Sequence, residues 1–235
     1  MSNKVLHYLS KAWLDMLFPE FCSACGQSLM DHEKAICQTC LAEIPPTDFH
    51  LQPNNPFFRE MKDRLTIDSA SAGFYFRKGN KVQRILHEIK YKGDSKSMKL
   101  LGKYYGQQLI EESHILEVDG IIPVPIHPKK LNKRGFNQSE LFAEGLAEVS
   151  GKKLITQDLK RIRNSESQIH KTREERLNSI KNDFHLMAKF PLRNKKILLV
   201  DDLMTTGATL EACGKLIYKE SNTPISLLTM AYTLI

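Results

Sequence analysis

The sequence predicts an α/β fold: a parallel sheet flanked by helices, with a small N-terminal zinc-binding unit. Its C-terminal part reads strand, helix, strand in KKILLVDD, LEACGKLIYKE and PISLLTMAY, an order that joins parallel strands through a crossover helix. DGIIPVPI is a continuous apolar run, typical of a strand that is buried on both faces. Two C-x-x-C pairs lie near the N-terminus, away from this pattern. At 235 residues the chain has room for one sizeable domain and a small appendage.

The composition indicates a globular protein with an anionic partner. Hydrophobic residues make up 41% of the chain, which suffices for a core, and the formal net charge is +7. Nucleic acid, a phosphorylated small molecule and an acidic protein all fit this charge, which does not choose among them.

The N-terminal stretch predicts an amphipathic helix rather than a membrane span. Val5, Leu9, Trp13 and Leu17 fit one helix face, but charged residues interrupt the run well short of the roughly 20 apolar residues that a span needs. No small-residue cleavage site follows. We therefore expect a cytoplasmic protein without membrane insertion.

Four of the five cysteines predict a structural zinc site. Cys22, Cys25, Cys37 and Cys40 form two C-x-x-C pairs, and four thiolates complete a tetrahedral site with no open position. Such a site replaces the core that so short a segment cannot build. A pair of disulfides is the alternative, which a reducing compartment disfavours. Cys213 stands apart in a predicted helix, where a buried core residue is expected.

A proline-rich stretch predicts the boundary between two domains. Four of the ten prolines fall between Pro45 and Pro56, so we expect a linker there with neither a helix nor an inner strand. We expect residues 1–56 to hold the N-terminal helix, the zinc finger and this linker, and residues 57–235 to form the main domain. The main domain continues with a strand at SAGFYF and with helices over roughly 82–89 and 98–109. A further helix is expected from about residue 138, capped by Asn137 with Glu140 three positions later.

The candidate site lies where KKILLVDD gives way to the next helix. Ligands of parallel sheets bind at the carboxyl ends of the strands, where Asp201 and Asp202 lie. The turn that follows offers backbone N–H groups and hydroxyls at a helix start, which favours a phosphate; it consists of Thr205, Thr206, Gly207, Ala208 and Thr209. The two carboxylates are suited to accept hydrogen bonds from neighbouring hydroxyls, as on a ribose. The alternative is an acidic strand end beside an ordinary threonine cap.

The segment VDDLMTTGAT resembles the phosphoribosyl pyrophosphate signature of type I phosphoribosyltransferases. The resemblance implies a phosphoribosyltransferase-like sheet. It also implies that Asp201 and Asp202 hold the ribose hydroxyls while Thr205 to Thr209 hold the 5′-phosphate.

Nearly the whole chain, from about Leu14 to Ile235, resembles the ComF family of competence proteins. The resemblance rests on the paired C-x-x-C knuckles followed in order by IKYKGD, PVPIHPKKLNKRGFNQS and RIRNSESQIHKTREERLN. It implies a role in natural transformation, the uptake of single-stranded DNA, alongside a DNA helicase-like partner.

Two basic segments are further candidates for ligand binding. Lys90 and Lys92 stand beside a flexible glycine in IKYKGD, and resemblance to the family's pyrophosphate loop favours a role there over an ordinary basic helix end. Arg134 offers a planar fork for phosphate in a segment crowded with cations, and Gln138 follows it; a solvated basic loop is the alternative.

The segment from Asp158 to Asp183 predicts an exposed arm, because charged residues dominate it. In phosphoribosyltransferases a flexible loop closes over the sugar. By resemblance Arg163, Gln168, Arg173 and Arg176 match the family's positions, while a merely solvated segment is the alternative.

Three hypotheses follow. As an enzyme, the protein would displace pyrophosphate from the anomeric carbon of phosphoribosyl pyrophosphate with help from Mg²⁺, and the two aspartates would stabilise the electron-poor ribose. As a sensor it would bind a phosphoribosyl ligand without turnover. As an adaptor it would bind DNA through basic surfaces. No acceptor pocket is recognisable in the sequence.

Overall fold

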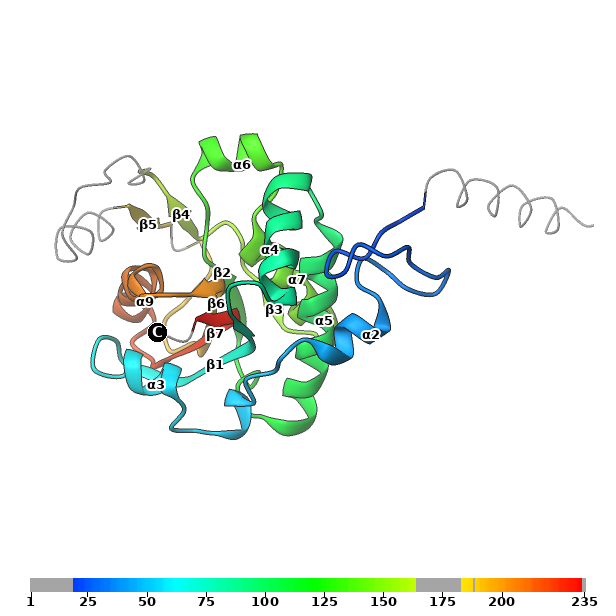
Figure 1. Ribbon diagram of the computed structural model, residues 1–235. Coiled ribbons are helices and arrows are strands. Elements are labelled where there is room, and N and C mark those ends of the chain that lie inside the picture. Colours follow the sequence, from blue (N-terminus) through cyan, green and yellow to red (C-terminus); the bar gives the residue numbers. More distant parts are fainter. Residues whose placement is uncertain (1–18, 164–182, 188, 234–235) are drawn as a thin grey trace, which may run out of the picture.

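The computed structural model describes residues 19–163, 183–187 and 189–233 (Figure 1). Its centre is a five-stranded sheet in the order β1-β7-β6-β2-β3, and all neighbouring strands run parallel. The strands are β1 Ile67–Phe76, β2 Gly120–Pro123, β3 Lys153–Leu154, β6 Ile197–Met204 and β7 Ile225–Thr233. The predicted parallel sheet is confirmed, and the strand that carries the two aspartates lies in the middle of it.

Helices cover both faces of the sheet (Figure 1). Each face has its own buried cluster of apolar side chains. One face packs against α4 Lys81–Lys92, α5 Lys96–Glu112 and α7 Gln138–Ser150. The other packs against α3 Pro56–Met61 and α9 Ala208–Ser221. Ile197 to Val200 of β6 are all 1% exposed or less, because side chains of both faces are covered.

Helices α5 and α7 cross in very close contact because glycines lie where they meet. A Cβ atom on Gly102 would lie 2.2 Å from the carbonyl oxygen of Phe142, and one on Gly145 would lie 2.3 Å from that of Lys99. This crossing was not singled out from the sequence. The close contact between the two helices fixes where α7 starts relative to the sheet.

The cysteine-rich segment packs against the first face of the sheet domain. Cys22, Ile36 and Cys40, the last in α2 Gln38–Glu43, belong to the same buried cluster as the apolar faces of α4 and α5. Asp94 accepts hydrogen bonds from Ser23 of this segment and from the backbone N–H of Ser97 at the start of α5. The two parts of the chain are therefore in contact, while the domain boundary at residue 56 stays a prediction.

The proline-rich segment is more ordered than a linker. The carbonyl oxygen of Pro45 accepts a hydrogen bond from Tyr75, and Thr47 donates its N–H to Gly73, so the segment runs along the edge of β1. A 3-10 helix, η1 Phe49–Leu51, follows. The expectation of no helix there was wrong, because Phe49 is 2% exposed and anchors the segment in the core.

Residues 128–134, for which a solvated basic loop was the alternative to ligand binding, form a short helix, α6 Pro128–Arg134. Two other expectations need correction. β6 does not stop at the aspartates but continues to Met204, so the turn begins at Thr205. The ends of the predicted arm are buried: β4 Leu159–Arg161 pairs antiparallel with β5 Phe184–Leu186, and Asp158 and Asp183 are 2% and 1% exposed. No helix among the described residues is both long and apolar enough to cross a membrane.

Candidate functional site

The two aspartates lie in the second half of β6, just beyond the end of the neighbouring strand β2. Val200, just before them, pairs with Pro123 at the end of β2, and Asp201 pairs with Thr229 of β7. Asp201 is buried and Asp202 is partly exposed. The pair therefore lies toward the carboxyl edge of the sheet, as predicted from the sequence, with one carboxylate directed inward and one accessible.

Asp201 is held by hydrogen bonds but lies in an unfavourable electrostatic environment. Its Oδ1 accepts a hydrogen bond from the hydroxyl of Ser139 at 2.8 Å and one from the backbone N–H of Asp202 at 2.9 Å. Burial, together with repulsion from the carboxylate of Asp202, raises the pKa of Asp201 to about 8, against the effect of these bonds. A group that donates hydrogen bonds to the pair, such as a ribose hydroxyl, would relieve this strain.

The turn after β6 ends in a helix start that no side chain caps. Gly207 is the N-cap of α9 with φ +70°, and it receives no side-chain cap. Among the described residues, the backbone N–H groups of Thr205, Thr206 and Gly207 form no hydrogen bond. Thr205 and Thr206 are exposed, while Ala208 is buried. Free N–H groups at the start of a 14-residue helix are suited to an anion.

A second helix start without a side-chain cap, that of α7, lies near the end of β2 and near Asp201. Asn137 is the N-cap of α7, as predicted, but its side chain does not cap the helix; Nδ2 instead donates to the carbonyl oxygen of Val124 just beyond β2. Its Oδ1 and the Nε2 of Gln138 are buried without a hydrogen-bond partner among the described residues. Arg134 donates to the Oε1 of Gln138. Two predicted ligand residues, Arg134 and Gln138, are thus joined, and Ser139 next to them reaches Asp201.

The predicted residues Lys90 and Lys92 lie at the end of α4, elsewhere on the chain's surface. Lys92 pairs with Glu88 at 3.0 Å and lines a groove of about 820 Å³ between α4 and the cysteine segment. This groove contains none of residues 134–139 or 201–209. Two of its cations pair with acids of the same groove, Lys92 with Glu88 and Lys96 with Glu20. The role of the two lysines in ligand binding stays a prediction.

Of the residues predicted on the arm, only Arg163 is described. It is exposed and follows β4. Gln168, Arg173 and Arg176 lie outside the described residues.

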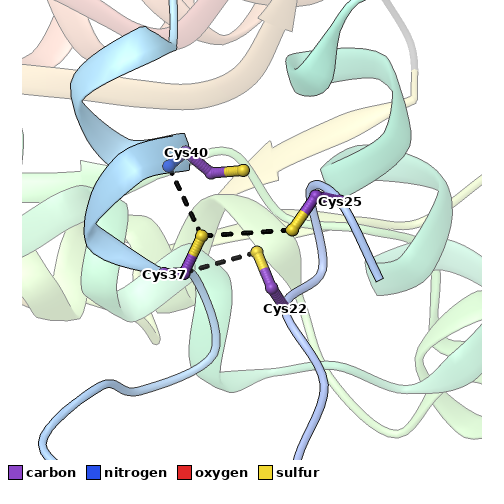
Figure 2. A group of neighbouring side chains, drawn as sticks. All are labelled: Cys22, Cys25, Cys37 and Cys40. Atoms are coloured by element: carbon purple, nitrogen blue, oxygen red, sulfur yellow. Dashed lines mark hydrogen bonds between the residues drawn. The ribbon is translucent and has the colours of Figure 1, made fainter. Parts of the chain in front are cut away.

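The four predicted zinc ligands come together. Their sulfur atoms all lie within 4.8 Å of one another, and the Cys25 and Cys37 sulfurs are 4.0 Å apart (Figure 2). A tetrahedral zinc with Zn–S bonds of about 2.3 Å would separate its sulfurs by about 3.8 Å, so the cluster fits this ion closely. All five cysteines of the chain are free thiols. The cluster could therefore hold a metal such as zinc.

The surroundings of the cysteines lower the pKa of one thiol, Cys22, and raise the pKa of two others, Cys37 and Cys40. Burial acts to raise the pKa of Cys22, but backbone N–H groups, among them that of Cys37 at 3.3 Å, lower it to about 7. Burial raises the pKa of Cys40 to about 12 in the metal-free protein. A metal must displace that proton, so its affinity depends on pH. Cys213 is fully buried in α9, as predicted.

Two residues that the sequence did not single out contact the candidate site. Ser139 binds Asp201, and Arg64 binds the carbonyl oxygen of Thr206 in the turn. Arg64 lies far from the turn in the sequence, and no local pattern connects the two. Ser139 ends the segment PVPIHPKKLNKRGFNQS, in which Arg134, Asn137 and Gln138 were singled out from the sequence but Ser139 was not.

Comparisons with known proteins agree with the family resemblance and find only distant likenesses among solved structures. No family model matches the chain. Among solved structures, the allosteric regulatory enzyme of purine biosynthesis is 20% identical over 55% of this chain and a quarter (25%) of its own, with a TM-score of 0.38. A hypoxanthine phosphoribosyltransferase from Staphylococcus aureus is 13% identical over 62% of this chain and 69% of its own, with a TM-score of 0.35. Since both scores are below 0.5, the fold class rests on the chain's own sheet topology.

The curated relatives are competence and DNA utilization proteins. DNA utilization protein YhgH of Salmonella typhimurium is 28% identical over 153 residues, which cover 64% of this chain and 66%, just under two thirds, of that protein. Competence protein F of Haemophilus influenzae is 27% identical over 86% of this chain and 80% of its own length. Competence protein ComFC of Bacillus subtilis is 25% identical over 88% of this chain and 75% of its own. These relatives confirm the resemblance to the ComF proteins.

Proposed function

We propose that the chain binds phosphoribosyl pyrophosphate, or a related sugar phosphate, at the end of β6. The observation that carries the proposal is an aspartate pair with an uncapped helix start on either side: Ser139 at the start of α7 binds Asp201, and a short turn leads from β6 to the start of α9. Helix starts attract phosphate groups, and paired carboxylates accept hydrogen bonds from a diol. A sugar phosphate is the small-molecule class that presents both.

In the proposed complex each group has a separate task. The turn from Thr205 to Thr209 holds the 5′-phosphate, and Asp202, with buried Asp201 behind it, accepts hydrogen bonds from the ribose hydroxyls. Arg134 and the amide nitrogen of Gln138 face the pyrophosphate at the start of α7. The Nε2 of Gln138 supports this assignment, because a buried N–H donor without an acceptor is unfavourable until a ligand accepts its hydrogen bond.

We further propose phosphoribosyl transfer as the activity. Displacement of pyrophosphate leaves an electron-poor ribose, which the accessible carboxylate of Asp202 stabilises while Asp201 behind it helps to orient the sugar, so no side-chain nucleophile is needed. A Mg²⁺ ion chelated by the ligand's oxygens would neutralise the leaving group. Zinc in the cysteine cluster would have no part in this chemistry, because all four of its positions are filled by the chain.

The relatives' names support a role in the use of DNA, and we propose that the protein acts in the cytoplasm. Single-stranded DNA and a DNA helicase-like competence protein are the proposed partners. α6 supports contact with a DNA backbone, since Lys129 and Lys133 on it are exposed. If it binds DNA, Lys133→Ala should weaken the binding and reduce its dependence on salt, while leaving the sugar-phosphate affinity unchanged.

Thermal unfolding with and without phosphoribosyl pyrophosphate and Mg²⁺ tests the binding site. At ligand concentrations about 100 times the Kd, binding adds about 2.7 kcal/mol to the stability, so the unfolding midpoint should rise by several degrees. Asp202→Asn should abolish most of the rise. Asp68→Asn, the same change on an exposed residue near the amino end of β1, should leave it intact. A wild-type midpoint that does not move at saturating ligand would refute the site.

Release of pyrophosphate then separates enzyme from sensor. An enzyme incubated with phosphoribosyl pyrophosphate and a panel of nucleobases should release pyrophosphate with at least one of them, whereas a sensor should show the thermal shift without release.

A further inference from the structure

Arg64 contacts the proposed phosphate turn although it lies 142 residues before Thr206 in the sequence. It follows α3, and its guanidinium donates from Nη1 to the carbonyl oxygen of Thr206 at 2.7 Å. The same guanidinium holds Glu211 of α9 through Nε at 2.9 Å and Nη2 at 2.7 Å. Arg64 therefore links the turn that leads into α9 with the first residues of the helix itself.

The bond to Thr206 determines which way the next N–H group points. The peptide unit between Thr206 and Gly207 is planar and trans, so its carbonyl and its N–H point in opposite directions. With the carbonyl held against Arg64, the N–H of Gly207 is directed away from Arg64. If this peptide turned over, the turn would present a carbonyl oxygen, the negative end of the dipole, where a phosphate needs a donor.

The residue that follows this carbonyl is packed closely against the α3 segment. A Cβ on Gly207 would lie 2.6 Å from the Sδ of Met61 and 2.8 Å from the Cε of Met204, so both methionine side chains would have to move. Gly207 also has the positive φ that glycine adopts freely. The turn is thus packed on the side where Arg64 lies, while Thr205 and Thr206 are exposed.

Arg64 also neutralises Glu211, an acid close to the proposed phosphate. A carboxylate in the first turn of α9 would repel a phosphate bound at the same helix start, and its side chain is only 13% exposed. Arg64 and Lys215, the latter at 2.6 Å, neutralise it. The charge that would oppose the anion is thereby used to hold Arg64 in place.

We propose that Arg64 is a positioning residue for the phosphate turn, one that fixes the Thr206–Gly207 peptide in the orientation that binds an anion. This inference rests on the proposed function, since it concerns the same turn. It adds a residue outside the VDDLMTTGAT segment on which affinity for the 5′-phosphate depends.

Titration calorimetry with ribose 5-phosphate tests the proposal, because this probe carries the 5′-phosphate and both hydroxyls but no pyrophosphate. Arg64→Ala should raise its Kd about five- to tenfold, the range expected for one well-placed hydrogen bond. Arg59→Ala is the matched control: Arg59 lies on α3 and also donates to a backbone carbonyl, that of Asn54, but does not contact the turn. It should leave the Kd unchanged.

A conservative variant separates positioning from general stability. Arg64→Lys keeps a positive charge opposite Glu211, but an ammonium lacks the planar fork that holds two acceptors at once. We expect its unfolding midpoint without ligand to return close to that of the wild type, while its Kd stays raised. Wild-type affinity in Arg64→Ala, or an equal loss in Arg59→Ala, would overturn the proposal.

A ligand-free measurement keeps this inference distinct from the proposed function. If the wild type binds neither ribose 5-phosphate nor phosphoribosyl pyrophosphate, the proposed function fails. The ¹⁵N order parameter of Gly207 still tests Arg64: it should fall in Arg64→Ala and stay high in Arg59→Ala. An unchanged order parameter in Arg64→Ala would refute the role of Arg64 as well.

Discussion

At the scale of single residues, Asp201 lies where a carboxylate is costly for folding. It is buried, and its nearest charged neighbour along the strand has the same sign. Residues that reduce stability in this way are common where a protein must bind or transform a ligand. The expected benefit is a carboxylate pair whose hydrogen-bonding capacity is not used up by the protein itself.

Asp201→Asn should therefore stabilise the unliganded protein near neutral pH. The pKa of Asp201 is raised in the folded state, so the folded protein keeps this proton at a pH where the unfolded chain has lost it. Its contribution to stability is fully present below pH 3.8 and is lost as the pH rises to about 8. Asparagine carries no charge and can still accept from Ser139. We expect the variant's unfolding midpoint to exceed the wild-type value by at least about 2 °C at pH 8, and by less at pH 5.

Asp119 provides a comparison, because its pKa is shifted in the opposite direction to that of Asp201. The backbone N–H of Lys196 and the ammonium of Lys195 lower the pKa of Asp119. Its ionised form adds stability that is present at neutral pH and lost in acid, so Asp119→Asn should lower the midpoint slightly at pH 7. If Asp201→Asn also lowered the midpoint at every pH, the described electrostatics of the pair would be wrong.

At the scale of elements, the crossing of α5 and α7 decides where the second helix start lies. Gly102→Ala would force a methyl group against the backbone of Phe142, and neither backbone can move without displacing a helix. We expect a loss of about 3 kcal/mol in the free energy of unfolding, measured by urea denaturation. Gly151→Ala, at the C-cap of α7 with open space around it and φ +68°, should lose only about 1 kcal/mol from backbone strain. Equal losses in the two variants would contradict close packing as the cause.

The cysteine cluster is the other element whose chemistry can be tested alone. We expect the purified protein to contain one zinc per chain by elemental analysis. Cys40→Ser should abolish it, because serine replaces a buried thiolate ligand. Cys213→Ser removes a buried thiol away from the cluster and should keep the metal. A full zinc complement in Cys40→Ser, or a disulfide among Cys22, Cys25, Cys37 and Cys40, would contradict the predicted site.

At the scale of the whole molecule, the cysteine segment and the sheet domain share one buried cluster. Cys22, Ala24, Ile36, Cys40 and Ile44 contact it from the N-terminal side. We expect removal of the metal by a chelator to lower the unfolding midpoint of the whole protein in one transition, followed by circular dichroism. An unchanged main transition would show that the two parts fold independently.

Much of this architecture could be predicted from the sequence. The continuous apolar run of β6 and the helical spacing of α4 and α5 identified their elements, and the Cys-x-x-Cys spacing identified the cluster that the fold brings together. Asp201 and the turn from Thr205 were found because the chemistry and the strand end are adjacent in the chain. Arg64 and the glycine crossing were missed because they act through contacts between distant segments. The inward orientation of Asp201, which depends on Ser139, was missed for the same reason.

The most direct test of the central claim is to map the ligand on the protein by ¹H–¹⁵N chemical-shift changes. Phosphoribosyl pyrophosphate with Mg²⁺ should shift the amide signals of residues 205–209 at the start of α9 and of residues 137–139 at the start of α7. Signals from the groove beside the cysteine cluster, such as those of Ser23 and Asp94, should stay in place. Shifts confined to that groove, with the β6 turn unaffected at saturation, would contradict a sugar phosphate at the end of β6.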